Sequence, residues 1–492
     1  MKYNKYLLLF TLFLYNTSNC LAQFNLFSGK NALKNNTTGI QNTANGHDAL
    51  NYNRSGSYNT AIGAKVLFRN KDGESNTAVG FRSLYSNTSG SENVAFGSNA
   101  LNTNSTGNYN SAYGTFSLGF NQTGMNNTAI GYHALMSNTT ASANTAIGAF
   151  ALQSNTIGEN NVSLGYYALY NNDIGNRNVA LGTNTLGNNI SGNYNVASGH
   201  HSMMKNKSGS FNIAMGGQSL HNNVTGSKNI SLGYYSMYKN SSGLENTAVG
   251  TNSLANNLSG DYNTSTGSEA LKDNQTGNEN TAIGYRSLYR NTSGNKNTAI
   301  GYAAYERGFG YGNSTAIGAN THVSASNQMR FGDERVTSIG GKVSWSKLSD
   351  KRFKYDIKAN VPGLDFINKL KAVTYYVDAE KIRDFQGVEE CREKQKNIRE
   401  TGFIAQEVEK SASELGFLFS GVDRPESAED SYALRYAEFT VPLVQAVQEL
   451  SLENKSLKER IEKLETDNKK LILLQEEFSK IKSLLSSHAN IN

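Results

Sequence analysis

Ser349 and Lys354 are the residues whose types and spacing could carry out chemistry together. They stand five positions apart in the segment Ser-Asp-Lys-Arg-Phe-Lys. A serine hydroxyl is a poor nucleophile until a base takes its proton, and a neutral lysine amine can serve as that base. Burial and neighbouring cations, here Lys351 and Arg352, favour the neutral amine. The spacing alone is a weak signal, and the alternative is a turn-capping serine beside a solvated surface lysine.

The chain that must position this pair changes in composition near Trp345. Residues 345–492 hold 50 charged residues and all three prolines, whereas residues 1–344 hold 36 charged residues. The hydrophobic share of the whole chain is 37%, below the roughly 45–50% of globular domains, which argues against several large apolar cores. The net charge of +6 is spread thinly without a basic cluster, so we expect no nucleic-acid partner.

A 17-residue repeat organises the first part. Its glycine returns in strict register from Gly29 to Gly318, eighteen times, with Asn four residues before it in every unit but the last and usually Leu four residues after it. Each unit predicts one short strand such as Thr-Ala-Ile, a turn at Gly, a second apolar stretch ending in Leu, and a polar Asn/Gly turn. Gly and Asn are expected to supply the positive φ angles.

No single unit can bury its own Ile and Leu, so the units must stack into apolar and Asn ladders with backbone pairing between them. Eighteen units at about 4.8 Å predict a rod of roughly 85 Å. Residues 25–320 resemble the heads of bacterial trimeric adhesins, which carry a similar Val/Thr-Ala-Ile-Gly core. The resemblance implies a parallel β-roll in which three chains pack side by side. The predicted fold class is therefore mainly β, with solenoid repeats over residues 23–320.

Residues 321–345 break the 17-residue spacing and predict a neck. A small α+β domain is expected over residues 346–446. Its opening Ser-Asp-X-Arg-X-Lys-X-Asp-Ile resembles the endosialidase-type intramolecular chaperone domain, the S74 peptidase family. Further matching motifs follow in the expected order. They are Leu364–Ile367, Leu370–Tyr375, Gly402–Val408 and Ala446–Leu450.

The resemblance implies self-cleavage by a serine–lysine dyad, with Ser349 as nucleophile and Lys354 as general base. The expected scissile bond is Leu348–Ser349, and cleavage after Ser349 is the alternative. A histidine-based triad is nearly excluded, because no histidine lies between His322 and His488. The resemblance also implies that Gly402, Gln406 and Glu407 support cleavage or assembly. Gln406 or a backbone amide near Gly402 could stabilise an oxyanion.

Residues 447–487 predict a coiled coil, and the chaperone resemblance implies a trimer. Apolar side chains recur every seven residues at one core position, with polar interruptions at the other. The positions assigned to d are Leu450, Leu457, Leu464, Leu471, Phe478 and Leu485; those assigned to a are Val447, Asn454, Ile461, Asn468, Gln475 and Lys482.

Residues 1–22 predict a secretory signal removed after Ala22. Lys2 and Lys5 precede a short apolar run, and small residues precede the expected cut. A lipoprotein signal using Cys20 is the alternative. After removal Cys391 is the remaining cysteine and receives no role. No other segment is apolar enough to cross a membrane.

These patterns predict an exported homotrimeric surface fibre, adhesin- or appendage-like, whose C-terminal domain templates the trimer and then cuts itself off once, in cis. The alternative is a phage tail or neck fibre with the same self-cleaving chaperone. Glycans or matrix proteins are the expected ligands, and no cofactor or metal site is predicted. Asn-X-Ser/Thr triplets such as Asn87–Ser89 are interpreted as turn residues, repeat tyrosines as surface stacks, and His200–His201 as lacking a metal role.

Overall fold

The structure is a computed structural model that describes residues 24–306, 310–333, 335–343, 345–386, 398–425 and 430–489. The predicted signal segment and Cys391 lie outside these residues. The chain splits into two compact units, Met1–Val336 and Thr337–Asn492. Within the described residues, no helix is both long and apolar enough to span a bilayer.

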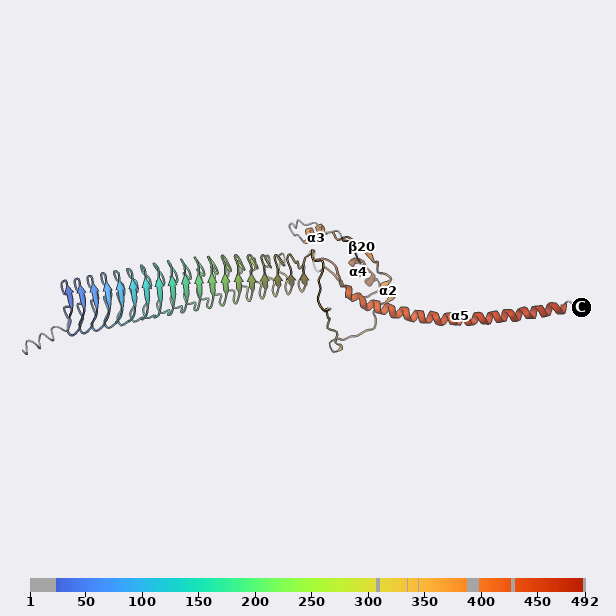
Figure 1. The fold of residues 1–492 in the computed structure, drawn as a ribbon, viewed down its shortest axis with the longest axis horizontal. Coiled ribbons are helices and arrows are strands. Elements are labelled where there is room, and N and C mark those ends of the chain that lie inside the picture. The colour runs from blue at the N-terminus through green and yellow to red at the C-terminus, as the bar shows by residue number, and fades with distance from the viewer. Residues whose placement is uncertain are drawn as a thin grey trace, which may run out of the picture. The chain divides into compact units, whose positions relative to one another are not determined.

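The first unit confirms the predicted parallel β-solenoid. Each turn of the chain, here called a rung, contributes one three-residue strand, and the strands stand in a single row (Figure 1). From β1 to β18 each strand pairs in parallel with the next at an offset of 17 residues, as Ala129 pairs with Ala146. The strands of this sheet are β1 (Leu26–Ser28), β2 (Thr43–Asn45), β3 (Thr60–Ile62), β4 (Thr77–Val79), β5 (Val94–Phe96), β6 (Ser111–Tyr113), β7 (Thr128–Ile130), β8 (Thr145–Ile147), β9 (Val162–Leu164), β10 (Val179–Leu181), β11 (Val196–Ser198), β12 (Ile213–Met215), β13 (Ile230–Leu232), β14 (Thr247–Val249), β15 (Thr264–Thr266), β16 (Thr281–Ile283), β17 (Thr298–Ile300), β18 (Thr315–Ile317) and β19 (Met329–Phe331).

The last strand closes the solenoid with a shorter rung. Met329 of β19 pairs with Thr315 of β18, an offset of 14 residues instead of 17. Strand β19 therefore lies within the residues predicted as a neck. Strand β19 forms although the 17-residue period has ended, because it pairs with the backbone N–H and C=O groups at the free edge of β18.

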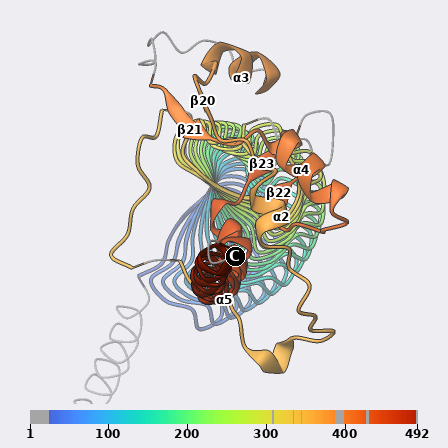
Figure 2. The same cartoon turned by 90° about the vertical axis from the view of Figure 1, so that its right-hand side faces the viewer.

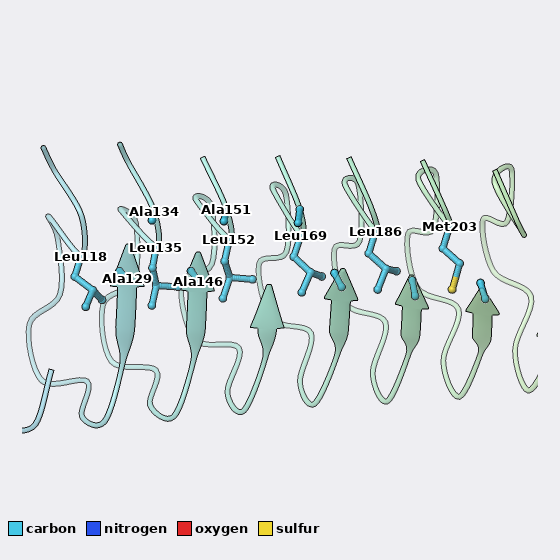
Figure 3. Packing of buried hydrophobic residues seen from close by; sticks show 14 of the residues in the cluster. Leu118, Ala129, Ala134, Leu135, Ala146, Ala151, Leu152, Leu169, Leu186 and Met203 are labelled. Atoms are coloured by element: carbon cyan, nitrogen blue, oxygen red, sulfur yellow. The ribbon is translucent and has the colours of Figure 1, made fainter. Parts of the chain in front are cut away.

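The core of the solenoid is a double ladder of small and branched apolar side chains. The middle residue of most strands is an alanine that points inward, and it faces the leucine four residues after the repeat glycine (Figure 3). Ala129 and Leu135 are both fully buried. Leu135 also donates its amide to the carbonyl of Ala151 in the next rung at 2.9 Å, so the turns are paired as well as the strands.

Positive φ angles fall on the repeat glycines, as predicted, and also on residues for which they were not predicted. The repeat glycine does adopt them, as at Gly131 (φ 136°), but the buried Leu135 (φ 50°) and the neighbouring His133 (φ 56°) adopt them too. A left-handed leucine costs about 1–2 kcal/mol. Burial of its side chain, worth about 1.5–3 kcal/mol, offsets that cost.

Two buried ladders of asparagine flank the core. Asn110 donates its side-chain amide to Asn93 Oδ1 at 3.1 Å and to the carbonyl of Gly124 at 2.9 Å, and Asn127 repeats the pattern one rung later. The second ladder includes Asn87, which donates to the Asn70 side chain at 2.8 Å. Because Asn87 is fully buried, its Asn-X-Ser triplet is not presented for glycosylation, in line with its interpretation as a turn residue.

The second unit holds a small α+β domain followed by a long helix. Its short strands pair antiparallel, β20 with β21 and β22 with β23, and β22 and β23 lie near α2 and α4 (Figure 2). Phe366, Val408, Ala412 and Phe439 form its buried core. The elements are η1 (Lys351–Phe353), α2 (Leu364–Ile367), β20 (Val373–Tyr375), α3 (Ala379–Gln386), β21 (Glu400–Gly402), α4 (Ala405–Glu414), β22 (Val422–Asp423), β23 (Ala433–Leu434), η2 (Tyr436–Phe439) and α5 (Thr440–Ala489).

Candidate cleavage site

The structure brings Ser349 and Lys354 together. Lys354 Nζ donates a hydrogen bond to Ser349 Oγ at 2.6 Å. That distance is within the range expected of a nucleophile and its base. The contact needs no distant element, because both side chains come from one short stretch of chain.

A single helical turn holds the two residues at this distance. Asp350 caps η1 by accepting a hydrogen bond from the amide of Arg352 at 2.9 Å. The amide of Lys354 donates to the carbonyl of Lys351 at 3.1 Å, which folds the lysine back toward the serine. The side-chain and backbone hydrogen bonds from Arg352 hold the pKa of Asp350 below its ordinary value. Asp350 and Arg352 thus shape the turn that makes the pair.

The pair faces solvent in the single chain. Ser349 and Lys354 are both exposed, and the side chain of Leu348, before the expected cut, is 80% exposed. The turn also carries exposed apolar side chains, Phe353 and Tyr355. In both ribbon views the segment with η1 loops away from α2, α4 and β22 (Figures 1 and 2). Helices α2 and α4 and strand β22 therefore do not shield the dyad from water.

The three predicted supporting residues lie elsewhere in the domain. Gly402 ends β21, and Gln406 and Glu407 open α4 with exposed side chains. Among the described residues, no hydrogen bond or ion pair joins any of the three to Ser349 or Lys354. The amide beside Gly402, that of Phe403, already donates to Tyr436 Oη at 3.1 Å, which argues against its use as an oxyanion donor.

Gly402 is a glycine for reasons of space. A Cβ at this position would overlap Tyr436 Oη and approach Tyr375 Oη to 3.1 Å. Both tyrosines and Gln406 line an open cavity of about 410 Å³, and burial raises the pKa of Tyr375. The motif Leu370–Tyr375 includes Tyr375 but assigns it no role, and no motif marks Tyr436; the two tyrosines meet Gly402 only through the fold.

Lys347 is a further residue that the motifs did not single out. Its Nζ pairs with Glu438 Oε1 of η2 at 2.7 Å, and this hydrogen bond lowers the pKa of Glu438. The pair ties the chain just before the expected scissile bond to the start of α5. Its partners are 91 residues apart, so no short-range motif predicts the contact.

Metal-binding side chains do not gather into a cluster in the described part of the chain. No three His, Cys, Asp or Glu side chains there are grouped to hold a metal ion. His200 and His201 stack on each other with ring centroids 3.8 Å apart. The cleavage pair therefore stands as the candidate site for chemistry.

Comparison with known proteins agrees with the motifs. Residues 349–417 match the peptidase S74 family, described as the chaperone of endosialidase. The match begins at Ser349 and includes Lys354, Gly402, Gln406 and Glu407. No curated protein and no solved structure matches the chain significantly. The chain is thus a fusion of a long parallel β-solenoid of 17-residue repeats with an endosialidase-type chaperone domain and a C-terminal helix.

Proposed function

We propose that this protein is an exported homotrimeric fibre whose C-terminal domain templates the trimer and then releases itself by cutting the Leu348–Ser349 bond. The observation that carries the proposal is the 2.6 Å contact between Lys354 Nζ and Ser349 Oγ at the start of the chaperone match. Long fibres with many contacts between chains assemble slowly, so a templating domain is physically useful.

The proposed reaction uses only residues of this chain and one water molecule. Ser349 Oγ attacks the carbonyl carbon of Leu348 while the neutral amine of Lys354 takes the hydroxyl proton. That proton passes to the amide nitrogen of Ser349 as the C–N bond breaks, leaving Leu348 as an ester on Ser349 Oγ. Water then hydrolyses the ester to the Leu348 carboxylate and restores the serine hydroxyl. The reaction is a single turnover in cis.

Cleavage is expected to follow assembly. A lysine amine in contact with water is protonated at neutral pH, and a protonated amine cannot act as a base. Packing of other chains around the exposed turn would favour the neutral form of Lys354 by removing water. The exposed Leu348 and Phe353 beside the dyad give such packing an apolar surface to cover.

The outer sheet face of the solenoid supports a trimer. We define this face as the first and third residues of strands β1–β18, whose side chains flank the inward alanine. None of these 36 positions carries a charge, and 14 of the 18 third positions are apolar or aromatic. Ile130 and Leu164, for example, are 40% and 47% exposed. Apolar surface of this extent marks an interface, and only a partner with the same repeat and length covers all of it.

A distinct surface supports the adhesin role. Residues one, two and five positions after the repeat glycine form what we call the aromatic corner. Tyr166, Tyr167 and Tyr170 contact one another there, with centroid distances of 4.4 and 4.7 Å, and the same pattern recurs four rungs later. Polar residues such as Thr183 and Asn184 interrupt the corner between these clusters. A discontinuous surface does not suit a trimer interface, but exposed aromatic faces suit neutral sugar rings.

The test of the cleavage proposal compares the wild type with Ser349→Ala and Lys354→Ala by intact-mass spectrometry. Wild type should release residues 349–492, a fragment of 144 residues, and both variants should remain whole. Lys358→Ala is the matched control, since Lys358 is another exposed lysine nearby and pairs with Asp356, outside the dyad; this variant should be cut like the wild type. An uncut wild-type trimer, or a cut Lys354→Ala, contradicts the dyad.

The test of adhesion measures binding of cellohexaose, chitohexaose and collagen to the full fibre by calorimetry. The double variant Tyr166→Ala/Tyr167→Ala should weaken sugar binding several-fold, whereas Tyr109→Ala, an exposed tyrosine outside the corner, should not. Absence of binding to both sugars contradicts a neutral-glycan site at the corner. A phage tail or neck fibre remains the second candidate function, because it shares the chaperone; export of the protein through its first 22 residues distinguishes the two.

A further inference from the structure

The C-terminal helix continues far beyond the domain that supports its start. Helix α5 runs unbroken from Thr440 to Ala489, 50 residues. Near its start it packs on α2 and η2, and Glu449 Oε2 accepts the amide of Leu364 at 2.7 Å. From Ser451 to Ser487 every residue is exposed. Most helices in proteins depend on packing of an apolar stripe, so this part of α5 requires a partner.

The first half of the exposed helix carries an ordinary coiled-coil seam. Apolar residues follow one another at alternating intervals of three and four, with Asn454 and Asn468 in the remaining core positions. Their side chains are 44–64% exposed. They are Val447, Leu450, Leu457, Ile461, Leu464 and Leu471.

The second half follows a different seam. After Leu471 the apolar residues at intervals of three, four, three and four are Leu474, Phe478, Ile481 and Leu485, all more than half exposed. Two intervals of three therefore meet at Leu471, since Asn468 precedes it by three and Leu474 follows it by three. Continuing the first register instead would put Gln475 and Lys482 in the core and leave Leu474 and Ile481 beside it.

We propose that α5 packs against other copies of this chain in two registers, joined by a three-residue discontinuity at Leu471. The inference rests on the proposed trimer and specifies its helical interface. In the second register, Leu474 and Ile481 occupy the core positions that the first register would assign to Gln475 and Lys482. A three-residue insertion overwinds a coiled coil locally, so the helices are expected to tighten around Leu471.

The position of the discontinuity identifies the partner and its direction. A seam with a local break packs well only against a helix that carries the same break at the same level. A parallel copy of α5 satisfies this condition at every layer. An antiparallel copy does not, because the break lies off the centre of the seam between Val447 and Leu485. The occupant of the face is therefore a parallel copy of the same helix.

Cysteine cross-linking in the full-length chain tests the two registers. The background carries Ser349→Ala, to keep the helix attached, and Cys391→Ser. Under mild oxidation Ile481→Cys should form inter-chain disulfides several-fold faster than Lys482→Cys, because only core positions bring identical side chains together. Lys480→Cys is the control, since it lies outside the core in either register.

Two deletions provide a second measurement that does not depend on disulfides. Deleting Leu471–Leu473 joins the two seams into one regular heptad pattern and should raise the temperature of the helical transition followed by circular dichroism. Deleting Lys458–Arg460, also three residues, breaks the first seam and should lower it. Faster cross-linking at Lys482→Cys, or a lower transition on deleting Leu471–Leu473, overturns the two-register proposal while the trimer stands. A monomer by light scattering overturns the proposed trimer and this inference together.

Discussion

Ser349 and Lys354 form their contact within one short turn, and Asp350 makes that turn. The carboxylate of Asp350 both caps η1 and pairs with the Arg352 guanidinium at 2.6 Å. The residues between nucleophile and base therefore have a structural task. This explains why the whole motif is a stronger signal than the five-residue spacing alone.

Replacing Asp350 should slow cleavage without abolishing it. In Asp350→Asn the ion pair with Arg352 is lost, although the asparagine oxygen can still cap the turn, so we expect the 144-residue fragment to appear several-fold more slowly in a time course. Asp356→Asn, which removes only the pair with Lys358, is the matched control and should leave the rate unchanged. Equal rates for both variants would contradict a role for the turn.

The pKa of Asp350 fixes the sign of the pH effect on this turn. Because its folded pKa is lowered, the carboxylate contributes fully above the ordinary aspartate value of about 3.9 and is lost as pH falls through the lowered pKa. Titration of Asp350 should therefore leave cleavage unaffected between pH 5 and 8, in contrast to its substitution.

The rung is the repeating element of the solenoid, and the two asparagine ladders bond each rung to the next in the same way. The side-chain oxygen of Asn110 accepts both the backbone and the side-chain amide of Asn127, while its own amide donates to Asn93 and Gly124. An amide supplies donors and an acceptor on one small group, so identical asparagines can bond to each other in series. A carboxylate in the same place cannot donate.

A charge in the ladder should therefore unfold the solenoid more easily. Asn110→Asp sets a buried carboxylate against the Asn93 and Gly124 oxygens, and we expect the free energy of unfolding to fall by more than about 3 kcal/mol at pH 7. Burial raises the pKa of such a carboxyl above the ordinary aspartate value, so the loss should shrink as the pH falls through the raised pKa and be smallest below about pH 4. Guanidinium denaturation followed by circular dichroism measures both.

The matched control for this ladder substitution is Asn108→Asp. Asn108 accepts the amide of Ser91 at 2.7 Å on the surface, and the same column holds a natural aspartate, Asp261, which accepts the amide of Leu244. We expect a change within about 0.5 kcal/mol, as for other surface substitutions. A comparable loss in both variants would mean that burial of the ladder is not what makes its asparagines necessary.

At the scale of the whole molecule, two surfaces lack cover in the single chain: the outer sheet face and the seam of α5. Both are apolar, both repeat along the chain, and both match the spacing of an identical chain. In each unit the interior is closed by local contacts, whereas these surfaces can be closed only by another copy. Packing thus favours association with further copies of the chain, and the chaperone match implies the number three that we propose.

Cross-linking through the outer sheet face tests the trimer in the solenoid itself. In a Cys391→Ser background, Ile130→Cys should give inter-chain disulfides, because Ile130 points outward from β7 onto the face that we assign to the interface. Gln122→Cys, in an exposed turn of the preceding rung, is the control and should stay reduced. Non-reducing electrophoresis measures both. Cross-linking of Gln122→Cys but not Ile130→Cys would assign the interface to another face.

The sequence by itself determined the repeat, its one strand per rung, the inward leucines and the buried asparagines. Each follows from a strict period of 17, because stacked identical units must place identical side chains in line. It also determined the serine–lysine pair, since both residues belong to one turn of chain. The spacing of residues in the sequence is enough to predict a contact when its two residues lie close in the chain or recur with the repeat.

Only the tertiary structure decided the remainder. It assigned positive φ to Leu135, extended the solenoid by β19, and placed Tyr436 and Tyr375 against Gly402. It also separated Gly402 and Gln406 from the dyad that they were expected to support. These features depend on free strand edges and on residues distant in the chain, and no interval in the sequence records which distant segments meet.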